Sequence, residues 1–250
     1  MEQKINSILK PEMAYDWDNV GLQIGTLDKP IQKILLTLDV TLEVVEEAIA
    51  NKCEVIVAHH PLIFRPLKQI IPTSHIGKIV LKIIENNISL YIAHTNFDCL
   101  ENGMNDYLAT ILGIENQKVF EQITEEYGLG VIGTIKKATL KDVATHVKNV
   151  FKLDALDIIG DENSLVETMA VIGGGGGTAI GTALNQNVDV FVSGDITYHD
   201  ALDARAMGQN IIHVNHNIEK LGLNRLKELL TPLGKELIIS SVDTNPYIRK

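Results

Sequence analysis

In the segment "EVIVAHHP" (54–61), four apolar residues run without a break into two histidines and a proline. Strands that are apolar on both faces are typical of largely parallel sheets. Amphipathic segments such as "TLEVVEEAIANK" (41–52) lie between runs of this kind, and strands that alternate with helices predict an α/β fold. Five other segments pass from an apolar run straight into a polar or glycine-rich stretch: "KILLTLDVT" (33–41), "SLYIAHTNFD" (89–98), "TMAVIGGGGG" (168–177), "VDVFVSGDIT" (188–197) and "NIIHVNHN" (210–217).

The alternation of strand and helix breaks between residues 115 and 165. There "YGLGVIGTI" (127–135) alternates and is interrupted by glycines, as in an antiparallel strand. We therefore predict two α/β domains with mixed, largely parallel sheets. Residues 1–115 plus 211–250 form the first domain, and residues 116–210 form a second domain inserted into it. The last segment, "KELIISSVDTNPYI" (235–248), predicts one further strand that returns to the first domain.

Composition excludes several classes of protein. The net charge of −10 and the absence of a basic cluster argue against binding to nucleic acid or to an anionic membrane. No apolar run has the length of a membrane span and the N-terminal stretch lacks the apolar core of a signal peptide, so a cytoplasmic location is expected. Cys53 and Cys99 form no disulfide framework and no metal-binding spacing, and we interpret both as small buried apolar residues.

Five of the eight histidines follow three different predicted strands. Because ligands bind beyond the carboxyl ends of parallel strands, we expect these segments to meet at one edge of a sheet. Histidine together with Asp and Glu, without cysteine, is the ligand set of hydrolytic zinc, manganese or iron sites. The sequence therefore predicts a divalent-metal site. The strand ends hold His59 and His60, then His94 with Asp98, and then His213 and His216 with Glu219.

The number of candidate ligands favours two ions over one. His216 and Glu219, three residues apart in the predicted first turn of a helix, lie on one face of it, and Asp98 is a carboxylate able to bridge. With His59 and His60 they make five ligands, about right for two ions per subunit that each keep an open position. The two neighbouring histidines can face one site because the proline after them ends the regular pleating of the strand. The ions can be zinc, iron or manganese.

Each ligand taken alone has an explanation that needs no metal. A histidine pair before a proline can simply end a strand, Asp98 can hold a turn, and a glutamate in a first helical turn is stabilised by the helix dipole. Their occurrence at three strand ends is what favours the metal site. His75 and His146, by contrast, lie in helical patterns, and we interpret them as surface residues.

Two further segments have two interpretations each. The run "GGGGG" (173–177) follows a strand and precedes a helix, where backbone N–H groups can hold an anion, but a tight turn would need the same glycines. In "SGDITYHDALDA" (193–204), Asp195, His199 and Asp200 could bind metal or line the same cavity, and Asp195 could equally cap the following helix. The candidates for the anion-binding turn are Gly173, Gly174, Gly175 and Gly176.

Nine motifs extend nearly from end to end of the chain: "WDNVGLQIG" (17–25), "LTLDVT" (36–41), "VAHHPLIF" (57–64), "YIAHTNFD" (91–98), "GMNDYLA" (103–109), the glycine run 173–177, "SGDITYHDALDA" (193–204), "VNHNIEKLGL" (214–223) and "DTNPY" (243–247). In the same order they resemble the motifs of the NIF-three-like dinuclear-metal proteins, often labelled type-2 GTP cyclohydrolase I homologues. The resemblance implies two α/β domains, a dinuclear site with ligands His59, His60, Asp98, His216 and Glu219, and a homohexamer built as a ring of dimers. Other members carry an extra domain inserted in mid-chain, which this chain of 250 residues lacks.

The predicted metal site and the resemblance are compatible with two functions of different kinds. In a metal-dependent hydrolase, two ions would lower the pKa of a bridging water towards neutrality, and His94 would transfer a proton or support a ligand. The family label implies GTP or a related small molecule as substrate, with its phosphates held by the glycine run or by nearby basic residues. The alternative is a non-catalytic hexamer that handles metal or binds partners. A purely structural role would leave the strand-end clusters unexplained.

Overall fold

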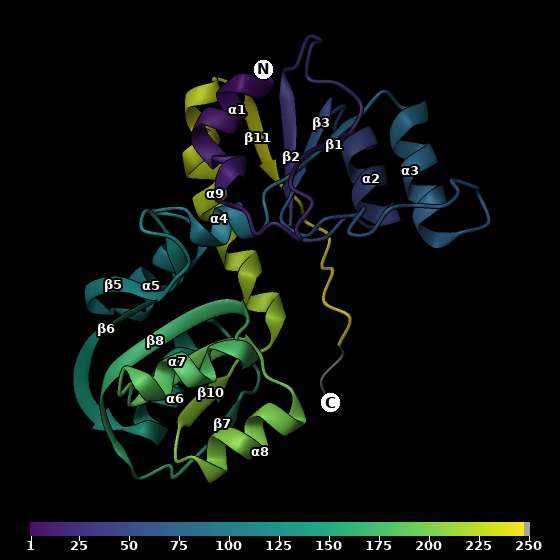
Figure 1. The fold of residues 1–250 in the computed structure, drawn as a ribbon. Coiled ribbons are helices and arrows are strands. Elements are labelled where there is room, and N and C mark those ends of the chain that lie inside the picture. The colour runs from purple at the N-terminus through teal and green to yellow at the C-terminus, as the bar shows by residue number, and fades with distance from the viewer. Residues whose placement is uncertain (248–250) are drawn as a thin grey trace. The chain divides into compact units, whose positions relative to one another are not determined.

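The computed structural model describes residues 1–247, which form two compact units (Figure 1). Among the described residues, unit 1 consists of Met1–Leu100 together with residues 223–247, and unit 2 consists of Glu101–Gly222. Residues 248–250, which end the predicted first domain, lie outside the described range. Within residues 1–247, every helix is too short or too polar to cross a membrane.

Unit 1 is a five-stranded sheet with helices on both faces. The strand order is β1-β4-β3-β2-β11, in which β1 pairs antiparallel with β4 and the other three pairings are parallel. The carboxyl ends of four strands therefore share one edge with the amino end of β1. The strands are β1 (Gly21–Ile24), β2 (Lys33–Thr37), β3 (Val55–Ala58), β4 (Ser89–Ile92) and β11 (Glu236–Ile239). The helices are α1 (Glu2–Leu9), α2 (Leu42–Ala50), α3 (His75–Glu85), α4 (Thr95–Cys99) and α9 (Gly222–Leu230), with 3₁₀ turns η1 (Pro11–Met13) and η4 (Thr231–Leu233).

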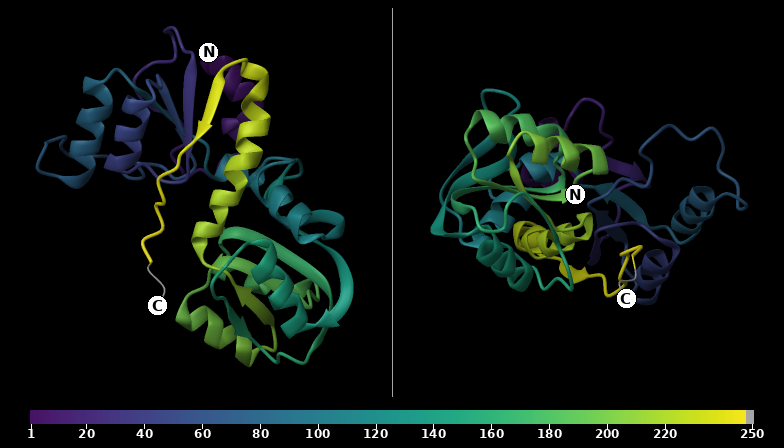
Figure 2. Two further views of the ribbon diagram at one scale, coloured as in Figure 1. Left: turned by 180° about the vertical axis from the view of Figure 1, so that it is seen from behind. Right: turned by 90° about the horizontal axis from the view of Figure 1, so that it is seen from below.

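The central strands of unit 1 are buried on both faces, as their continuous apolar sequences require. One face packs against α2 and α3, whereas Figures 1 and 2 show α1 and α9 on the opposite side of the sheet. On that side the hydroxyl of Tyr91 in β4 donates a hydrogen bond to Oδ1 of Asn6 in α1 (2.8 Å). The first face is one apolar cluster that includes Leu35, Val45, Ile56, Ile83 and Leu90.

Unit 2 is a six-stranded sheet in the order β5-β6-β8-β9-β10-β7. Strands β8, β9 and β10 are parallel, and the remaining pairings are antiparallel. Helices α7 and α8 contribute to the apolar cluster on one face, while α5 packs on β6 and β8 and α6 packs on β6 and on α5. The strands are β5 (Glu115–Gln122), β6 (Gly128–Thr139), β7 (Asp157–Ile159), β8 (Leu165–Gly175), β9 (Val190–Asp195) and β10 (Asn210–His213). The helices are α5 (Met104–Leu112), α6 (Leu140–Val150), α7 (Ile180–Asn185) and α8 (Tyr198–Ala206), with 3₁₀ turns η2 (Gly177–Ala179) and η3 (His216–Leu221).

The predicted α/β fold with mixed, largely parallel sheets is confirmed, since five of the nine strand pairings among the described residues are parallel. All six strands predicted from apolar runs are present, and β6 is antiparallel to both neighbours, as its alternation indicated. The boundaries between the two units differ from the predicted boundaries at residues 115 and 210. Helix α5 packs on β6 and β8, and β10 pairs with β9 and β7, so all of them belong to unit 2.

Two neighbouring residues of α3 test how the core of unit 1 contributes to stability. Ile83 is fully buried in the cluster under α3, whereas Ile84 is 54% exposed. Ile83→Ala should lower the free energy of unfolding by about 2–5 kcal/mol because it removes buried methyl groups and leaves a cavity. Ile84→Ala is the matched control and should cost less than about 1 kcal/mol. Urea titration followed by circular dichroism measures both, and equal losses would contradict the assigned core.

Candidate metal centre

Three histidines of unit 1 lie together at the edge where β3 and β4 end. His59 and His60 directly follow β3, and His94 comes two residues after β4. The ring centroids of His59 and His60 are 5.0 Å apart, and that of His94 lies 5.3 Å from His59 and 5.7 Å from His60. Each of the three rings has one nitrogen that lies within 4.8 Å of a nitrogen of both other rings. The three rings are therefore close enough to bind one ion.

The backbone explains how two neighbouring histidines face one cluster. In a regular strand, successive N–H groups point to opposite sides. Here the N–H groups of His59 and His60 both donate towards the same neighbouring segment, to the carbonyls of Thr37 (3.0 Å) and Leu38 (2.9 Å). The regular pleating therefore ends between the two histidines, one residue before Pro61.

Nδ1 of each histidine contacts an oxygen that can only accept a hydrogen bond. Nδ1 of His59 lies 2.8 Å from the carbonyl oxygen of Ala93, Nδ1 of His60 lies 2.7 Å from Oδ1 of Asp39, and Nδ1 of His94 lies 2.9 Å from both carboxylate oxygens of Asp18. The proton must then be on Nδ1, so Nε2 of the neutral ring carries the lone pair. This arrangement is characteristic of metal-binding histidines.

Asp18 and Asp39 are both ionised at neutral pH, which their role as acceptors requires. Burial raises the pKa of each carboxyl group, but hydrogen bonds outweigh it. His94 and the backbone and hydroxyl of Thr95 bond to Asp18 and lower its pKa to about 2. Hydrogen bonds from His60 and from the hydroxyl of Thr244 lower the pKa of Asp39. Both histidines thus donate to a carboxylate rather than to a neutral acid.

Asp98 adds a carboxylate to the cluster in unit 1. It lies in the short helix α4 rather than in a loop, with a side chain that is 12% exposed. Its Oδ1 is 3.6 Å from Nε2 of His59, which is fully buried. Two ligands bound at about 2.0–2.1 Å to one tetrahedral ion are separated by about 3.3 Å, so this spacing is close to that of two ligands on one metal.

The second group of candidate ligands, His216 and Glu219, lies in unit 2. The predicted first turn of a continuous α-helix is wrong, because both residues lie in the 3₁₀ helix η3, which precedes α9. A 3₁₀ helix has three residues per turn, so side chains at positions i and i+3 lie directly above one another. Nε2 of His216 and Oε2 of Glu219 are accordingly 3.0 Å apart, and the Glu219 side chain is only 2% exposed. The prediction that the pair shares one helix face is confirmed.

The glycine run has a structural explanation in unit 2. Strand β8 extends to Gly175, and a Cβ atom at Gly174 would come 2.7 Å from Oε1 of Glu219 and 3.4 Å from Nε2 of His216. A Cβ atom at Gly173 would come 3.2 Å from Cγ of Glu219. The glycines therefore leave room for the buried carboxylate. The N–H of Gly173 donates to Oδ1 of Asn105 (2.9 Å), and that of Gly176 to the Asp195 carbonyl (3.1 Å).

Anion binding by Gly173, Gly174, Gly175 and Gly176 stays a prediction. The alternative prediction that Asp195 caps the next helix is wrong. Thr197 caps α8 and forms a capping box with Asp200, which gives Asp200 a structural role. Asp195 is exposed, with Oδ2 3.8 Å from Nδ1 of His216.

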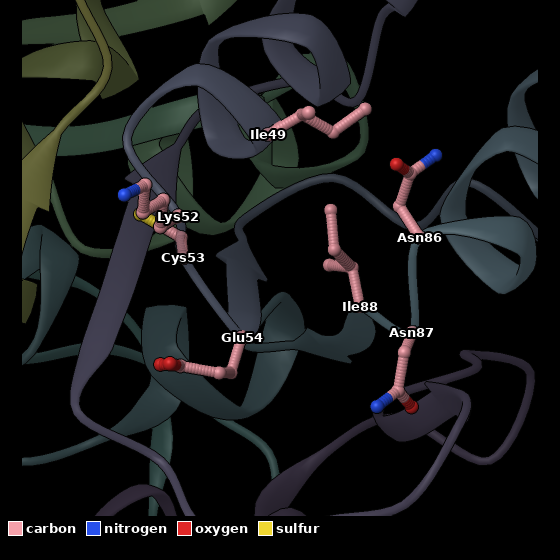
Figure 3. A pocket seen from close by; sticks show the side chains of 7 residues that line it. All are labelled: Ile49, Lys52, Cys53, Glu54, Asn86, Asn87 and Ile88. Carbon is pink, nitrogen blue, oxygen red and sulfur yellow. The ribbon is translucent and has the colours of Figure 1, made fainter.

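A pocket of about 290 Å³ opens at the opposite edge of unit 1, where β3 and β4 begin (Figure 3). It brings together the connections from α2 to β3 and from α3 to β4. Burial raises the pKa of the Cys53 thiol in this pocket to about 11 and that of Cys99 to about 12, so neither is a thiolate at neutral pH. This agrees with their interpretation as buried apolar residues. The lining residues are Ile49, Lys52, Cys53, Glu54, Asn86, Asn87 and Ile88.

Asp18, Asp39 and Thr244, which support the histidines, were not among the residues predicted from the sequence. Asp39 follows β2, so the rule that selects residues after parallel strands would have found it. Asp18 precedes β1, and its position at this edge depends on the antiparallel direction of β1, which no sequence motif shows. Thr244 reaches Asp39 because β11 pairs with β2 in the same sheet.

Comparison with known proteins places the whole chain among related sequences. A match to the family described as Duf34/NIF3 (NGG1p interacting factor 3) covers residues 1–246. A Streptococcus pneumoniae protein named "GTP cyclohydrolase 1 type 2 homolog" is 34% identical over 255 aligned residues, which cover 98% of this chain and 96% of that protein. The crystal structure of a Staphylococcus aureus protein has a TM-score of 0.93 at 30% identity, covering 100% of this chain and 97% of the other. That of a Bacillus cereus protein "related to NIF3" has a TM-score of 0.90 at 29% identity, covering 100% and 99%.

A pair of neighbouring glycines tests the contact between the glycine run and the His216–Glu219 pair. Gly174→Ala should displace the Glu219 carboxylate and weaken binding of a divalent ion by about 10- to 100-fold, the range seen when the supports of metal ligands are lost. Gly175→Ala is the matched control, because a Cβ atom there meets no atom within 4 Å. Isothermal titration with zinc or manganese measures both. Unchanged affinity in Gly174→Ala, or an equal loss in both variants, would contradict the assigned contact.

Proposed function

Because the chain belongs to the Duf34/NIF3 family, we propose that it binds two divalent metal ions and is a metal-dependent hydrolase of a nucleotide or a related small molecule. The observation that carries the proposal is the contact made by Nδ1 of each of the three histidines in unit 1 with a hydrogen-bond acceptor, which leaves Nε2 as the ligand atom of the neutral ring. The donor set suits a divalent ion, because neutral imidazole and carboxylate are its usual ligands.

In this proposal the five ligands serve one pair of ions. His59, His60 and Asp98 come from unit 1, and His216 and Glu219 come from unit 2. That both groups bind the same ions rests on the family resemblance alone. The expectation that all three histidine segments meet at one edge of one sheet is wrong, because β10, which precedes His216, belongs to the sheet of unit 2. Ions held there would lower the pKa of a coordinated water towards neutrality and would polarise the bond under attack.

His94 is the residue that we assign to proton movement. Nε2 accepts a proton from the attacking water and returns it to the leaving group, while Nδ1 stays bonded to Asp18. Asp18 stabilises the imidazolium that forms, because its side chain is buried and ionised. The carboxylate also fixes the orientation of the ring. The label "GTP cyclohydrolase 1 type 2 homolog" of the Streptococcus pneumoniae relative makes GTP the first substrate to test.

Replacing a ligand by its isosteric amide should separate metal binding from folding. In Asp98→Asn and Glu219→Gln the carboxylate charge is lost at constant size, and metal affinity should fall by at least about 100-fold, the upper end of what loss of a supporting residue costs. His75→Ala changes an exposed histidine and is the control. Elemental analysis of the purified variants measures bound metal, and wild-type metal content in both amide variants would contradict the ligand assignment.

An activity screen on the same samples tests the hydrolase itself. The wild-type protein, loaded in turn with zinc, iron or manganese, is assayed with GTP, other nucleotides and phosphoesters. Turnover that disappears in Asp98→Asn supports the proposal. Two bound ions without any turnover would contradict it and would favour the non-catalytic role in metal handling or partner binding.

Light scattering tests the homohexamer that the resemblance implies, with an expected mass six times the 27.5 kDa of one chain.

A further inference from the structure

Three aromatic side chains of unit 1 lie beside the histidine cluster, and we name Tyr15, Trp17 and Phe64 the aromatic group. The rings of Tyr15 and Trp17 are stacked, with centroids 5.3 Å apart and planes inclined by 15°. Phe64 meets Trp17 at a centroid distance of 5.9 Å and an angle of 65°. The imidazole of His94 lies 6.3 Å from Trp17. The aromatic group therefore borders the histidine cluster directly.

The aromatic group exposes large apolar rings to solvent. Trp17 is 58% exposed and Phe64 is 46% exposed. Tyr15 stacks on one face of Trp17, so a ligand that stacks on the indole would use the other face. Aromatic rings of this kind bind other flat rings by stacking, without regard to the exact pattern of donors and acceptors.

Hydrogen bonds anchor the backbone next to Phe64 and the residue next to Trp17. The side chains of Asn19 and Gln23 donate to the carbonyl of Ile63, at 2.6 and 3.0 Å, and the N–H of Ile63 donates to Oε1 of Gln23 at 3.0 Å. These bonds hold the residue before Phe64 against the segment that follows Trp17. The carboxylate of Asp18, the next residue after Trp17, is fixed by His94 and Thr95. Rings held in place in this way lose little freedom when a ligand binds.

We propose that the aromatic group binds a planar heteroaromatic ring of the substrate. This ring stacks on Trp17, and Phe64 lies at the edge of the bound ring. The inference rests on the proposed function, because it assigns the substrate class of the same site. Stacking beside His94 would place the ring next to the residue that moves the proton. Two exposed rings cover far less than the roughly 800 Å² per partner of a stable protein interface, which favours a small molecule over a second copy of the chain.

Trp17 is the single tryptophan of the chain, so its fluorescence reports on this position alone. Metal-loaded full-length protein is titrated with GMP, with AMP and with ribose 5-phosphate, which has the same sugar phosphate without a base. GMP or AMP should quench the fluorescence to saturation, whereas ribose 5-phosphate should not. Equal quenching by all three, or no quenching by either nucleotide, would overturn the inference.

Variants of the aromatic group assign the binding to stacking. Trp17→Leu and Phe64→Leu should each weaken binding of the nucleotide that quenches in calorimetry by roughly 5- to 100-fold, and Trp17→Phe should restore part of the loss. Tyr198→Leu changes a tyrosine that is 78% exposed in unit 2 and should leave the affinity unchanged. Wild-type affinity in Trp17→Leu would overturn the inference, and so would a change of mass in light scattering without a change of affinity, which would indicate an interface between copies.

Metal content measured in the same samples separates the two proposals. Trp17→Leu should keep its ions and lose the nucleotide. A wild-type protein that binds the nucleotide but no metal would contradict the dinuclear site and support the stacking position. A wild-type protein that binds metal but neither nucleotide would contradict the stacking position and support the dinuclear site.

Discussion

Nδ1 of the buried His59 donates a hydrogen bond to the carbonyl of Ala93. The position of that carbonyl is fixed by the pairing of two strands. Strands β3 and β4 are parallel and pair Ala58 with Ile92, and the N–H of Ala93 donates back to the carbonyl of Ala58 (2.9 Å). A proton on Nε2 instead would set the lone pair of Nδ1 against a carbonyl oxygen 2.8 Å away that can only accept, so the neutral ring keeps its proton on Nδ1. The register of the sheet thus determines which nitrogen of His59 is available to a metal.

His60 and His94 depend on carboxylates from other parts of the same edge. Asp39 follows β2 and supports His60, and Asp18 precedes β1 and supports His94. The hydroxyl of Thr244, in the segment after β11, bonds in turn to Asp39. Residues next to every strand of the sheet in unit 1 thus contribute to the state of three imidazoles. A change far from the histidines in sequence can therefore alter their orientation and their ability to bind metal.

The sequence was sufficient for those features that depend on short-range patterns. Apolar runs predicted the six strands, and the residues after them included all three histidines of the cluster in unit 1. The direction of β1 was not predictable, because pairing direction depends on distant segments, and Asp18 was missed for that reason. The predicted boundary at residue 115 placed α5 in the first domain, because the sheet that a helix covers depends on distant segments of the chain. The spacing of His216 and Glu219 was correct for a 3₁₀ turn as well as for an α-helix, so the wrong helix type did not affect the predicted pair.

The glycine run shows a different limit. Glycine between a strand and a helix is compatible with anion binding and with a close contact, and the choice depends on what packs against it. At Gly174 the neighbour is the buried carboxylate of Glu219, which comes from a segment more than forty residues away in the sequence. The structure thus adds the packing partner, which the local sequence does not contain.

The tautomeric state of His59 shows whether the register of the sheet leaves Nε2 available to a metal. Long-range proton–nitrogen correlation spectra of the metal-free, ¹⁵N-labelled protein at neutral pH distinguish the protonated from the unprotonated ring nitrogen, and the exposed His75 provides an internal reference. We expect a single tautomer for His59, with the proton on Nδ1 and an unprotonated Nε2. A proton on Nε2, or rapid exchange between both nitrogens as at an exposed histidine, would contradict it.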